Sequence, residues 1–385
     1  MLNVGINGFG RIGRAIFRIN ELHRRFRVVA INDLDPNLDN HSYLLRYDST
    51  YGRFEGEVVS DNRRRELSVN GQAIAFSSEP RVQDVPWKPR GVDVVIEASG
   101  VRENVLAGRG LIAAGGARKM IVTHAPSEGV DQTIIFGVNE DAYDSRRHHV
   151  IAASICDANA IAPVLRVLDQ EYGVTDGFVT TLHPWLPYQN LIDGSVRSIS
   201  SPGHFWNDFA LGRASTMSLI PKQTTAMSAV RQVLPEVGAR LEAISFRVPT
   251  AIVSSSDMTV SLARPVTAEM LNGTFARMQA EHGAIYGYQT EDLVSIDHLA
   301  IRQSVVVDGR WTRVTAAGLC KLVLWYDNEW GFSNRVVDLV KLVEHGLEKA
   351  PRNHEQSVGT RFRRSPVRLP GRVPDHIDER VSPTE

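Results

Sequence analysis

Residues 2–22 read LNVGINGFGRIGRAIFRINEL, and this stretch decides the first half of the fold. The apolar run at residues 3–7 predicts a β-strand, and the run after the last glycine has apolar residues at helical spacing. Between them, Gly8, Gly10 and Gly13 form the pattern G-x-G-x-x-G. The tight turn requires the first glycine, approach of the backbone to a pyrophosphate requires the second, and close packing of helix on strand requires the third. The N-terminus of the helix would attract the phosphate charge.

An acidic residue follows at the distance that a dinucleotide-binding unit requires. The sequence VVAIND ends a second predicted strand at Asp33, twenty residues after Gly13. A carboxylate there can accept hydrogen bonds from the ribose hydroxyls of adenosine, and it would repel a ribose phosphate. Two other interpretations are an ordinary glycine turn and a helix cap at Asp33. The order of strand, glycines, helix, strand and acid favours a site for NAD over one for NADP.

Strand-like and helical patterns alternate through the first 150 residues, which predicts parallel strands joined by crossover helices. From about Gly177 the strand-like runs become longer and richer in Val, Ile, Thr and Ser, as in a mixed sheet. The predicted class is therefore α/β, with a Rossmann-type doubly wound parallel sheet and an α+β catalytic domain that has a mixed sheet. The predicted strands are residues 3–7, 27–32, 92–97, 120–123 and 149–153, and then 177–182, 241–247, 252–262 and 319–325.

The end of the chain contains one more predicted helix and a tail. Ser333 has the character of an N-cap, and apolar residues recur after it at helical spacing until Pro351. The last 35 residues are rich in Arg and Pro and poor in clustered hydrophobic residues, so we predict that they are disordered. The predicted division is an NAD-binding domain at residues 1–154 completed by the helix at 333–350, a catalytic domain at 155–332, and a disordered tail at 351–385.

Composition excludes several classes of function. The 385 residues include 43 basic and 44 acidic side chains with a formal charge of -1, so no net charge attracts nucleic acid or an anionic membrane. The chain shows neither a secretory signal pattern nor an apolar run long enough to span a bilayer. Its two cysteines, Cys156 and Cys320, lie far apart, and no zinc-type spacing occurs. We predict a soluble, cytoplasmic protein without a disulfide or a metal site, and without nucleic acid or membrane as a partner.

Cys156 and His183 have the chemistry needed for covalent catalysis. Cys156 immediately precedes a helical run, where the helix N-terminus favours the thiolate, and His183 ends the strand-like run GFVTTLH. An imidazole can withdraw the thiol proton, the thiolate can attack an aldehyde, and hydride can leave the adduct for nicotinamide. Taken alone, the cysteine can also be an inert buried thiol and the histidine a structural residue.

Four blocks of the sequence, NGFGRIGR, YDSTYGRF, FRVPTA and WYDNEWGFSNRVVDL, are similar to the glyceraldehyde-3-phosphate dehydrogenase family. The resemblance runs from Leu2 to about Leu347, and Cys156 and His183 have the family's catalytic spacing. It implies NAD as cofactor, a small aldehyde as substrate, a homotetramer, and the cysteine as nucleophile with the histidine as base. For the cofactor it implies contacts with Gly8, Gly10, Arg11, Ile12, Gly13, Asp33, Ser99, Gly100, Pro126, Phe332 and, at the nicotinamide carboxamide, Asn328.

The nucleophile block departs from the family pattern. The family reads S-C-T-T-N there, with hydroxyls that help to hold inorganic phosphate, whereas Ile155 and Asp157 flank the cysteine here. The carboxylate of Asp157 opposes an incoming phosphate by like charge. The arginine and the glycine expected further along the chain are Leu211 and Thr225, so only Thr224 remains of that anion site.

The rest of the substrate side differs as well. The resemblance assigns Arg247 to the substrate phosphate, but two family threonines beyond the base correspond to Leu186 and Tyr188, as in erythrose-4-phosphate dehydrogenases. The segment 194–212 is longer than usual and carries three aromatic residues. In the family this loop approaches a neighbour's cofactor. The insertion therefore either reshapes the pocket or extends packing at a subunit interface, and we favour packing.

Three hypotheses follow from these features. The first is NAD-dependent oxidation of a small polar aldehyde, such as glyceraldehyde 3-phosphate or erythrose 4-phosphate, with release of the acyl group to water. The second is a phosphorylating enzyme with a rebuilt phosphate site. The third is an NAD-binding paralogue without turnover that acts through its aromatic loop or basic tail, because the carboxylate of Asp157 raises the pKa of the cysteine and disfavours the thiolate.

Overall fold

The first half of the chain forms a mainly parallel sheet. The computed structural model describes residues 1–199, 201–207 and 209–349. In this part of the chain the sheet contains β1 (Asn3–Asn7), β2 (Arg27–Asn32), β5 (Val58–Asp61), β6 (Glu66–Val69), β7 (Gln72–Ser77), β8 (Val94–Glu97), β9 (Lys119–Val122), β10 (Gln132–Thr133) and β11 (Val150–Ala152). Their order is β10-β11-β9-β8-β1-β2-β7-β6-β5, parallel from β10 to β7 and antiparallel beyond. The central strands are buried throughout, as expected for a parallel sheet covered on both faces.

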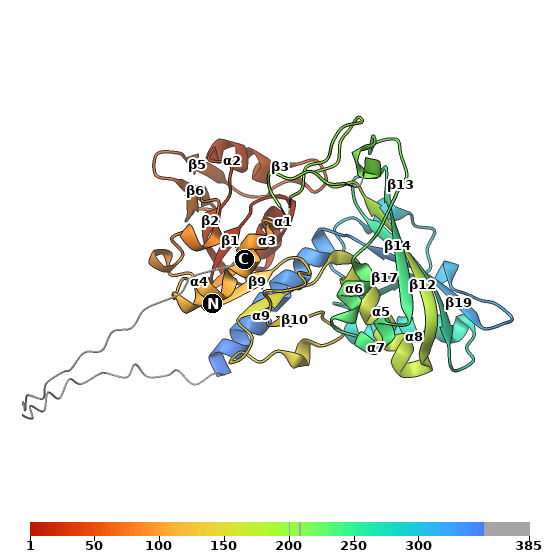
Figure 1. The fold of residues 1–385 in the computed structure, drawn as a ribbon. Coiled ribbons are helices and arrows are strands. Elements are labelled where there is room, and N and C mark those ends of the chain that lie inside the picture. The colour runs from red at the N-terminus through yellow and green to blue at the C-terminus, as the bar shows by residue number, and fades with distance from the viewer. Residues whose placement is uncertain (200, 208, 350–385) are drawn as a thin grey trace, which may run out of the picture. The chain divides into compact units, whose positions relative to one another are not determined.

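Helices of the first half connect these strands, and the last described helix returns to them. The helices are α1 (Arg11–His23), α2 (Leu38–Arg46), α3 (Arg102–Leu106), α4 (Gly108–Ala113) and the returning α9 (Trp330–Lys349), and β3 (Tyr47–Asp48) pairs with β4 (Gly52–Arg53). Helix α9 packs on α1 and β9, and Figure 1 shows it in blue beside β9. Its apolar residues Val336 and Val340 are buried in the same cluster as the strands of this sheet.

The N-cap predicted at Ser333 is wrong. Helix α9 begins three residues earlier, at Trp330, and the Ser333 backbone N–H donates to the carbonyl of Glu329 within the helix. The carboxylate of Asp327 instead accepts hydrogen bonds from the first N–H groups, those of Glu329 and Trp330. Asp327 therefore caps the helix, because its side-chain oxygen pairs with backbone N–H groups that would otherwise have no partner.

The second half forms a mixed sheet. Its described strands are β12 (Val174–Pro184), β13 (Ile220–Lys222), β14 (Leu241–Val248), β15 (Ser254–Leu262), β16 (Tyr286–Gln289), β17 (Val305–Asp308), β18 (Arg313–Val314) and β19 (Leu319–Tyr326). The order is β13-β14-β12-β15-β19-β17-β16, with β18 paired to β19. Strand β12 pairs in parallel with β14 and antiparallel with β15. The helices are α5 (Cys156–Tyr172), α6 (Ala226–Arg231), α7 (Pro235–Gly238) and α8 (Ala268–His282).

The two sheets have separate hydrophobic clusters, and Cys156 lies where they meet. Apolar residues of β1, β2, β8, β9 and α9 form one cluster, and those of α5, β12, β15, β17 and β19 form another. The partly buried Cys156 packs against both. The predicted α/β class, with a doubly wound parallel sheet and a mixed second sheet, is confirmed. The nucleophile candidate therefore sits at the junction of the two halves.

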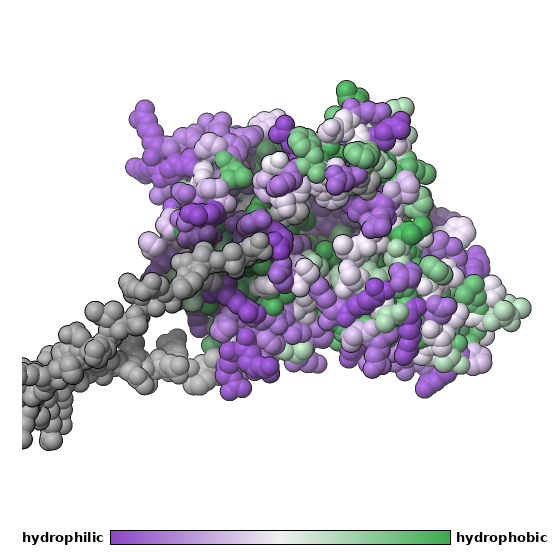
Figure 2. Space-filling view, in the orientation of Figure 1, coloured by the Kyte–Doolittle hydropathy of each residue, from purple (hydrophilic) through white to green (hydrophobic). Residues whose placement is uncertain are grey.

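The surface differs between the two halves. Hydrophilic residues dominate over α2 and β5, whereas hydrophobic residues gather over β13 and β19 (Figure 2). The exposed apolar side chains include Phe178 on β12 and Ile244 on β14, which are 66% and 53% exposed. None of the described helices is both long and apolar enough to cross a membrane. The tail predicted at 351–385 lies outside the described residues.

Candidate functional site: a dinucleotide groove leading to a buried cysteine

The glycine turn between β1 and α1 has the geometry that its sequence pattern requires. Gly8 has a φ of +92°, and a Cβ there would lie 2.5 Å from the backbone nitrogen of Ser99. A Cβ on Gly10 would meet no heavy atom within 4 Å, so the backbone is open to a ligand. A Cβ on Gly13 would lie 2.2 Å from the carbonyl oxygen of Gly8. The three glycines thus provide a left-handed turn, an accessible backbone and close packing of α1 on the turn.

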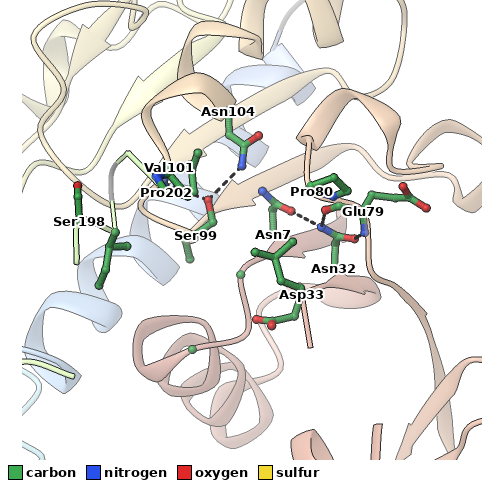
Figure 3. Close-up of a pocket in the computed structure, with 15 residues that line it drawn as sticks. Asn7, Asn32, Asp33, Glu79, Pro80, Ser99, Val101, Asn104, Ser198 and Pro202 are labelled. Atoms are coloured by element: carbon green, nitrogen blue, oxygen red, sulfur yellow. Dashed lines mark hydrogen bonds between the residues drawn. The ribbon is translucent and has the colours of Figure 1, made fainter. Parts of the chain in front are cut away.

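A hollow opens in front of this turn, and Asp33 lies in its wall (Figure 3). The Asp33 carboxylate accepts a hydrogen bond of 2.7 Å from the backbone nitrogen of Phe9, which fixes it beside the glycines. Helix α2 is capped by Asn37, so the interpretation of Asp33 as a helix cap is wrong. The hollow is also lined by residues that the sequence did not single out, namely Asn7, Asn32, Glu79, Asn104 and Pro202. The side chains of Asn7 and Asn32 hydrogen-bond to each other at the floor.

Ser99 and Gly100 continue the groove from the end of β8. Ser99 lines the hollow with Asp33, while Gly100 and Pro126 line a neighbouring hollow. The buried carboxylate of Glu97 accepts hydrogen bonds from the backbone and hydroxyl of Ser99 and from Asn7. Burial raises the pKa of Glu97 to about 7, although these hydrogen bonds act in the opposite direction. Through these hydrogen bonds Glu97 fixes the positions of Asn7 and Ser99, which line the hollow.

The side chains of Arg11 and Ile12 point away from the groove. The Arg11 guanidinium forms ion pairs with Asp48 and Glu329, and Ile12 packs against the first hydrophobic cluster. Only the backbone N–H groups of these first helical residues are left to face a phosphate. The ion pair with Glu329 also joins α1 to the loop before α9. Glu329 follows Asn328 in that loop.

Asn328 and Phe332 lie around the start of α9. Both are buried, and the Asn328 side-chain oxygen has no hydrogen-bond partner among the described residues. A buried amide oxygen without a partner is unfavourable unless a ligand donates to it. Phe332 belongs to the first hydrophobic cluster. The residues of the groove therefore fit a dinucleotide, and the free oxygen of Asn328 is an acceptor that a ligand could use.

Cys156 is the first residue of α5, directly after β11. The preceding Ser154 has a φ of 63°, so the chain turns sharply before the cysteine. The pKa of the Cys156 thiol is raised well above its usual range by burial, then by the charge and hydrogen bond of Asp157, and Arg247 acts in the opposite direction. The helix N-terminus predicted for Cys156 is present, but the neighbouring carboxylate and burial outweigh its effect on the thiol.

His183 faces the sulfur from strand β12. Its Nε2 lies 3.6 Å from the Cys156 Sγ, and its Nδ1 lies 2.8 Å from the carbonyl oxygen of Pro184. Because a carbonyl can only accept, Nδ1 carries the proton and Nε2 presents its lone pair to the sulfur. Burial, and then the nearby charge of Arg247, lower the pKa of His183 to about 4. The ring is therefore neutral at pH 7 and can accept the thiol proton.

Asp157 closes the site on the other side of the sulfur. Its Oδ1 lies 3.5 Å from the Cys156 Sγ and accepts a hydrogen bond of 2.9 Å from the Tyr326 hydroxyl. The sequence did not single out Tyr326. The alternation of buried and exposed residues along β19 places it on the inner face of the sheet, and this pattern could have indicated it.

Arg247 is a buried cation next to His183. Parallel pairing of β12 with β14 places it directly beside His183. Among the described residues no carboxylate pairs with it, its Nε has no partner, and its one side-chain hydrogen bond, 3.5 Å long, goes to the Tyr188 hydroxyl. A buried guanidinium without a counter-ion favours binding of an anion.

Apolar residues cover the region where the family places its second anion site. Leu211 is fully buried with Val196 and Ile220, and the Tyr188 ring stacks on Trp206 beside them. Two other predicted residues make local contacts: the Thr224 hydroxyl accepts from the backbone nitrogen of Ala226, and the Leu186 backbone nitrogen donates to the side chain of Gln189. The structure therefore brings Arg247 and Tyr188 together, but it builds no second cationic site from Leu211.

The inserted segment lines the cofactor groove of its own chain. Ser198, Ile199 and Pro202 contribute to the hollow that contains Asp33 (Figure 3). A Cβ on Gly100 would lie 3.3 Å from the Ile199 side chain, so the segment approaches the groove closely. This position agrees with the interpretation that the insertion reshapes the pocket, rather than with packing at a subunit interface alone.

We predicted no metal site because the sequence shows no metal-ligand spacing. The fold, however, brings three possible metal ligands close together. In the described chain the ligand atoms of Cys156, Asp157 and His183 lie within 4.8 Å of one another. Two of these residues are adjacent in the sequence, but the third comes from a strand 27 positions away. Sequence spacing therefore gave no signal for this cluster.

Comparison with known proteins agrees with this geometry. Residues 2–105 match the family description "Glyceraldehyde 3-phosphate dehydrogenase, NAD binding domain", and residues 155–328 match the C-terminal domain of the same family. The chain is 39% identical over 345 residues to glyceraldehyde-3-phosphate dehydrogenase 2 of Bacillus subtilis, which covers 89% of this chain and 96% of the relative. It is 37% identical over 350 residues to the protein of the same name from Streptomyces avermitilis, which covers 90% of this chain and 99% of the relative. The chain therefore belongs to the glyceraldehyde-3-phosphate dehydrogenase family, a family of NAD-dependent dehydrogenases.

Proposed function

We propose that this dehydrogenase oxidises a small phosphorylated aldehyde through a thioester on Cys156 and releases the acyl group to water. The observation that carries the proposal is the carboxylate of Asp157 in the first turn of α5, 3.5 Å from the sulfur. A phosphate acceptor would need hydrogen-bond donors there, and it would meet a negative charge. Water has no charge and is not repelled.

The oxidation uses the pair of Cys156 and His183. His183 Nε2 accepts the thiol proton as the sulfur attacks the carbonyl carbon, and it returns this proton to the new oxygen, which forms a thiohemiacetal on Cys156. The thiohemiacetal hydroxyl then gives its proton to His183, and the same carbon gives its hydride away, leaving a thioester. NAD, when bound in the groove, accepts the hydride. Asn328 would orient the carboxamide, and its unpartnered oxygen supports this role.

The release step uses the carboxylate beside the sulfur. A water molecule attacks the thioester carbon, Asp157 accepts a proton from it, and the carbon–sulfur bond breaks to give a carboxylic acid and the Cys156 thiolate. The proton then returns to the sulfur. The hydrogen bond from Tyr326 holds Asp157 in place during this step.

The substrate class follows from Arg247. This buried guanidinium lies beside His183 and has no carboxylate partner in the described part of the chain, so the phosphate of a three- or four-carbon aldose phosphate can pair with it. Glyceraldehyde 3-phosphate and erythrose 4-phosphate are the two candidates. Leu211, which stands where the family has an arginine, is apolar and offers no cation to a free phosphate.

The test is a substrate panel with chelator-treated protein. NADH formation is measured with both aldose phosphates and with their unphosphorylated analogues, each with and without inorganic phosphate, and the product is identified as the free acid. We expect NADH from an aldose phosphate at the same rate in both arms. Strict dependence on phosphate or arsenate would support a phosphorylating enzyme instead, and NAD binding without NADH in any arm would support an impaired paralogue.

A double variant, Ile155→Ser with Asp157→Thr, restores the two hydroxyls that the family has beside the cysteine. We expect inorganic phosphate to accelerate this variant and not the wild type. Variant rates that stay independent of phosphate would contradict the role given to Asp157.

We also propose, as the resemblance implies, a homotetramer in the cytoplasm. The exposed apolar residues Phe178 and Ile244 on neighbouring strands β12 and β14 support association, because a monomer seldom exposes such a face. Light scattering of the purified protein tests this assembly, and a monomer at micromolar concentration would contradict it.

A further inference from the structure

In the cluster of Cys156, Asp157 and His183, the two distances to the sulfur match those of a metal site, and the carboxylate and imidazole must approach each other to complete it. The sulfur lies 3.5 Å from the Asp157 Oδ1 and 3.6 Å from the His183 Nε2, and the three ligand atoms all lie within 4.8 Å of one another. Zinc forms bonds of about 2.3 Å to sulfur and about 2.0–2.2 Å to nitrogen and oxygen, so two ligands of a tetrahedral ion lie about 3.5 Å apart. Both edges that include the sulfur already have this length.

The donor atoms are also in the right chemical state. The His183 Nδ1 donates to the Pro184 carbonyl, which leaves a lone pair on Nε2 that faces the sulfur. The Tyr326 hydroxyl donates to Asp157 and orients its carboxylate in the same way. Binding requires only that the thiol lose its proton to solvent as the metal–sulfur bond forms. A thiolate, an imidazole and a carboxylate together favour zinc over calcium or magnesium.

Opposing charges set the strength of such a site. A dication would relieve the repulsion between the Asp157 carboxylate and a thiolate at Cys156. Arg247, which lies beside His183 on the next strand, repels a dication, and so does Lys222, whose charge also lowers the pKa of His183. Together they favour a site that fills and empties reversibly, with a fourth position left open to water.

We propose that Cys156, Asp157 and His183 form a reversible site for a borderline-soft divalent cation, of which zinc fits best, and that its occupancy stops aldehyde oxidation. The metal takes the sulfur of the nucleophile and the nitrogen of the base, so neither can react while it is bound. The binding itself is independent of the proposed function, and only the effect on turnover rests on it.

Cobalt(II) titration of the chelator-treated, full-length protein tests the binding. We expect one equivalent to give the sulfur-to-cobalt charge-transfer absorption and the intense visible bands of a tetrahedral ion, and zinc to displace it. Cys156→Ser should abolish the charge-transfer band, and Asp157→Thr should raise the dissociation constant for zinc at least about tenfold. Cys320→Ala is the matched control, because this second cysteine lies in the core away from the cluster, and it should bind like the wild type.

Circular dichroism and NAD binding establish that each variant is folded. The proposal is overturned if the wild type shows no charge-transfer band, if Asp157→Thr binds zinc as tightly as the wild type, or if Cys320→Ala loses the band. Where an aldehyde is turned over, micromolar zinc should inhibit the wild type and chelator should restore the rate, whereas the Asp157→Thr variant should need at least about tenfold more zinc. Because the spectrum does not depend on turnover, an enzyme that is inactive on every aldehyde would still report the site.

Discussion

Two helices of this chain begin directly after strands of the parallel sheet, and their first turns differ in charge. Helix α1 follows β1 and has no acidic residue in its first turn, and the backbone at Gly10 is open. Helix α5 follows β11 and carries Asp157 in its first turn. Both N-termini attract anions. The first is left free for the phosphates of a cofactor, while the second already holds a carboxylate of the protein itself.

This difference shows how one family can keep its cofactor and change its chemistry. The cofactor end depends on glycines and Asp33, all of which the chain retains. The chemistry of acyl release depends on what stands next to the cysteine, and in the proposed function the single carboxylate of Asp157 repels inorganic phosphate and acts as a base. Changes at the two helix termini should therefore have separable effects.

The largest effect is expected at the start of α5, where Cys156 would carry the acyl group. Cys156→Ser removes the nucleophile and should lower NADH formation by at least about a thousandfold, because a serine hydroxyl is a far weaker nucleophile at neutral pH. NAD binding, measured by fluorescence titration, should stay unchanged, since the α1 terminus is untouched. A variant that kept a tenth or more of the wild-type rate would show that another residue carries the acyl group.

The next effect belongs to the cofactor end. Asp33→Ala should raise the dissociation constant for NAD by about tenfold to a hundredfold, because hydrogen bonds to a charged acceptor are lost. It should also weaken the discrimination against NADP, since the repelling charge is removed. The exposed Asp141 provides a control, Asp141→Ala, that should leave both affinities unchanged. Equal NAD affinity in Asp33→Ala and wild type would contradict the assignment.

A smaller effect measures the charge at α5 directly. Burial and then the Asp157 carboxylate raise the pKa of the Cys156 thiol, so little thiolate exists at pH 7. Asp157→Asn removes the charge, lowers that pKa and should speed alkylation by iodoacetamide in chelator-treated protein, roughly tenfold for each unit of pKa. Mass spectrometry of the buried Cys320 in the same sample gives the internal control. Slower or unchanged labelling would mean that the carboxylate does not control the thiol.

The last effect is on stability and not on turnover, and it concerns the floor of the cofactor groove. Burial raises the pKa of Glu97 to about 7 in the folded chain, from 4.5 for the free side chain. The folded protein therefore binds this proton more tightly than the unfolded chain, and the stability it provides is present below pH 4.5 and is lost as the pH rises to about 7. Relative to Glu97→Gln, the wild type should lose about 3 kcal/mol of unfolding free energy across this range, since each unit of pKa shift corresponds to about 1.4 kcal/mol, and urea titration measures the loss. Parallel pH curves for the two proteins would exclude this role.

Most of the fold could be predicted from the sequence because its signals are local. The strands at 3–7 and 27–32 have the observed bounds, and those of the second half differ mainly at their ends. The start of α9 was misplaced because Asp327, outside the apolar repeat, supplies the cap instead of Ser333. Hydrophobic period and glycine spacing indicate elements well, but a cap depends on which side chain reaches the free N–H groups.

The features of the candidate site also divide into those that the sequence indicates and those that only the fold brings about. The sequence by itself indicated the glycine turn, because this depends on residue type and short spacing, and its resemblance to the family indicated Cys156, His183 and the departure at Asp157. Only the tertiary structure decided that the sulfur lies 3.6 Å from the imidazole and 3.5 Å from the carboxylate. It likewise decided that the Tyr326 hydroxyl, 169 positions from Asp157, holds that carboxylate. These distances are set by the packing of α5 against the mixed sheet, and no local pattern in the chain encodes them.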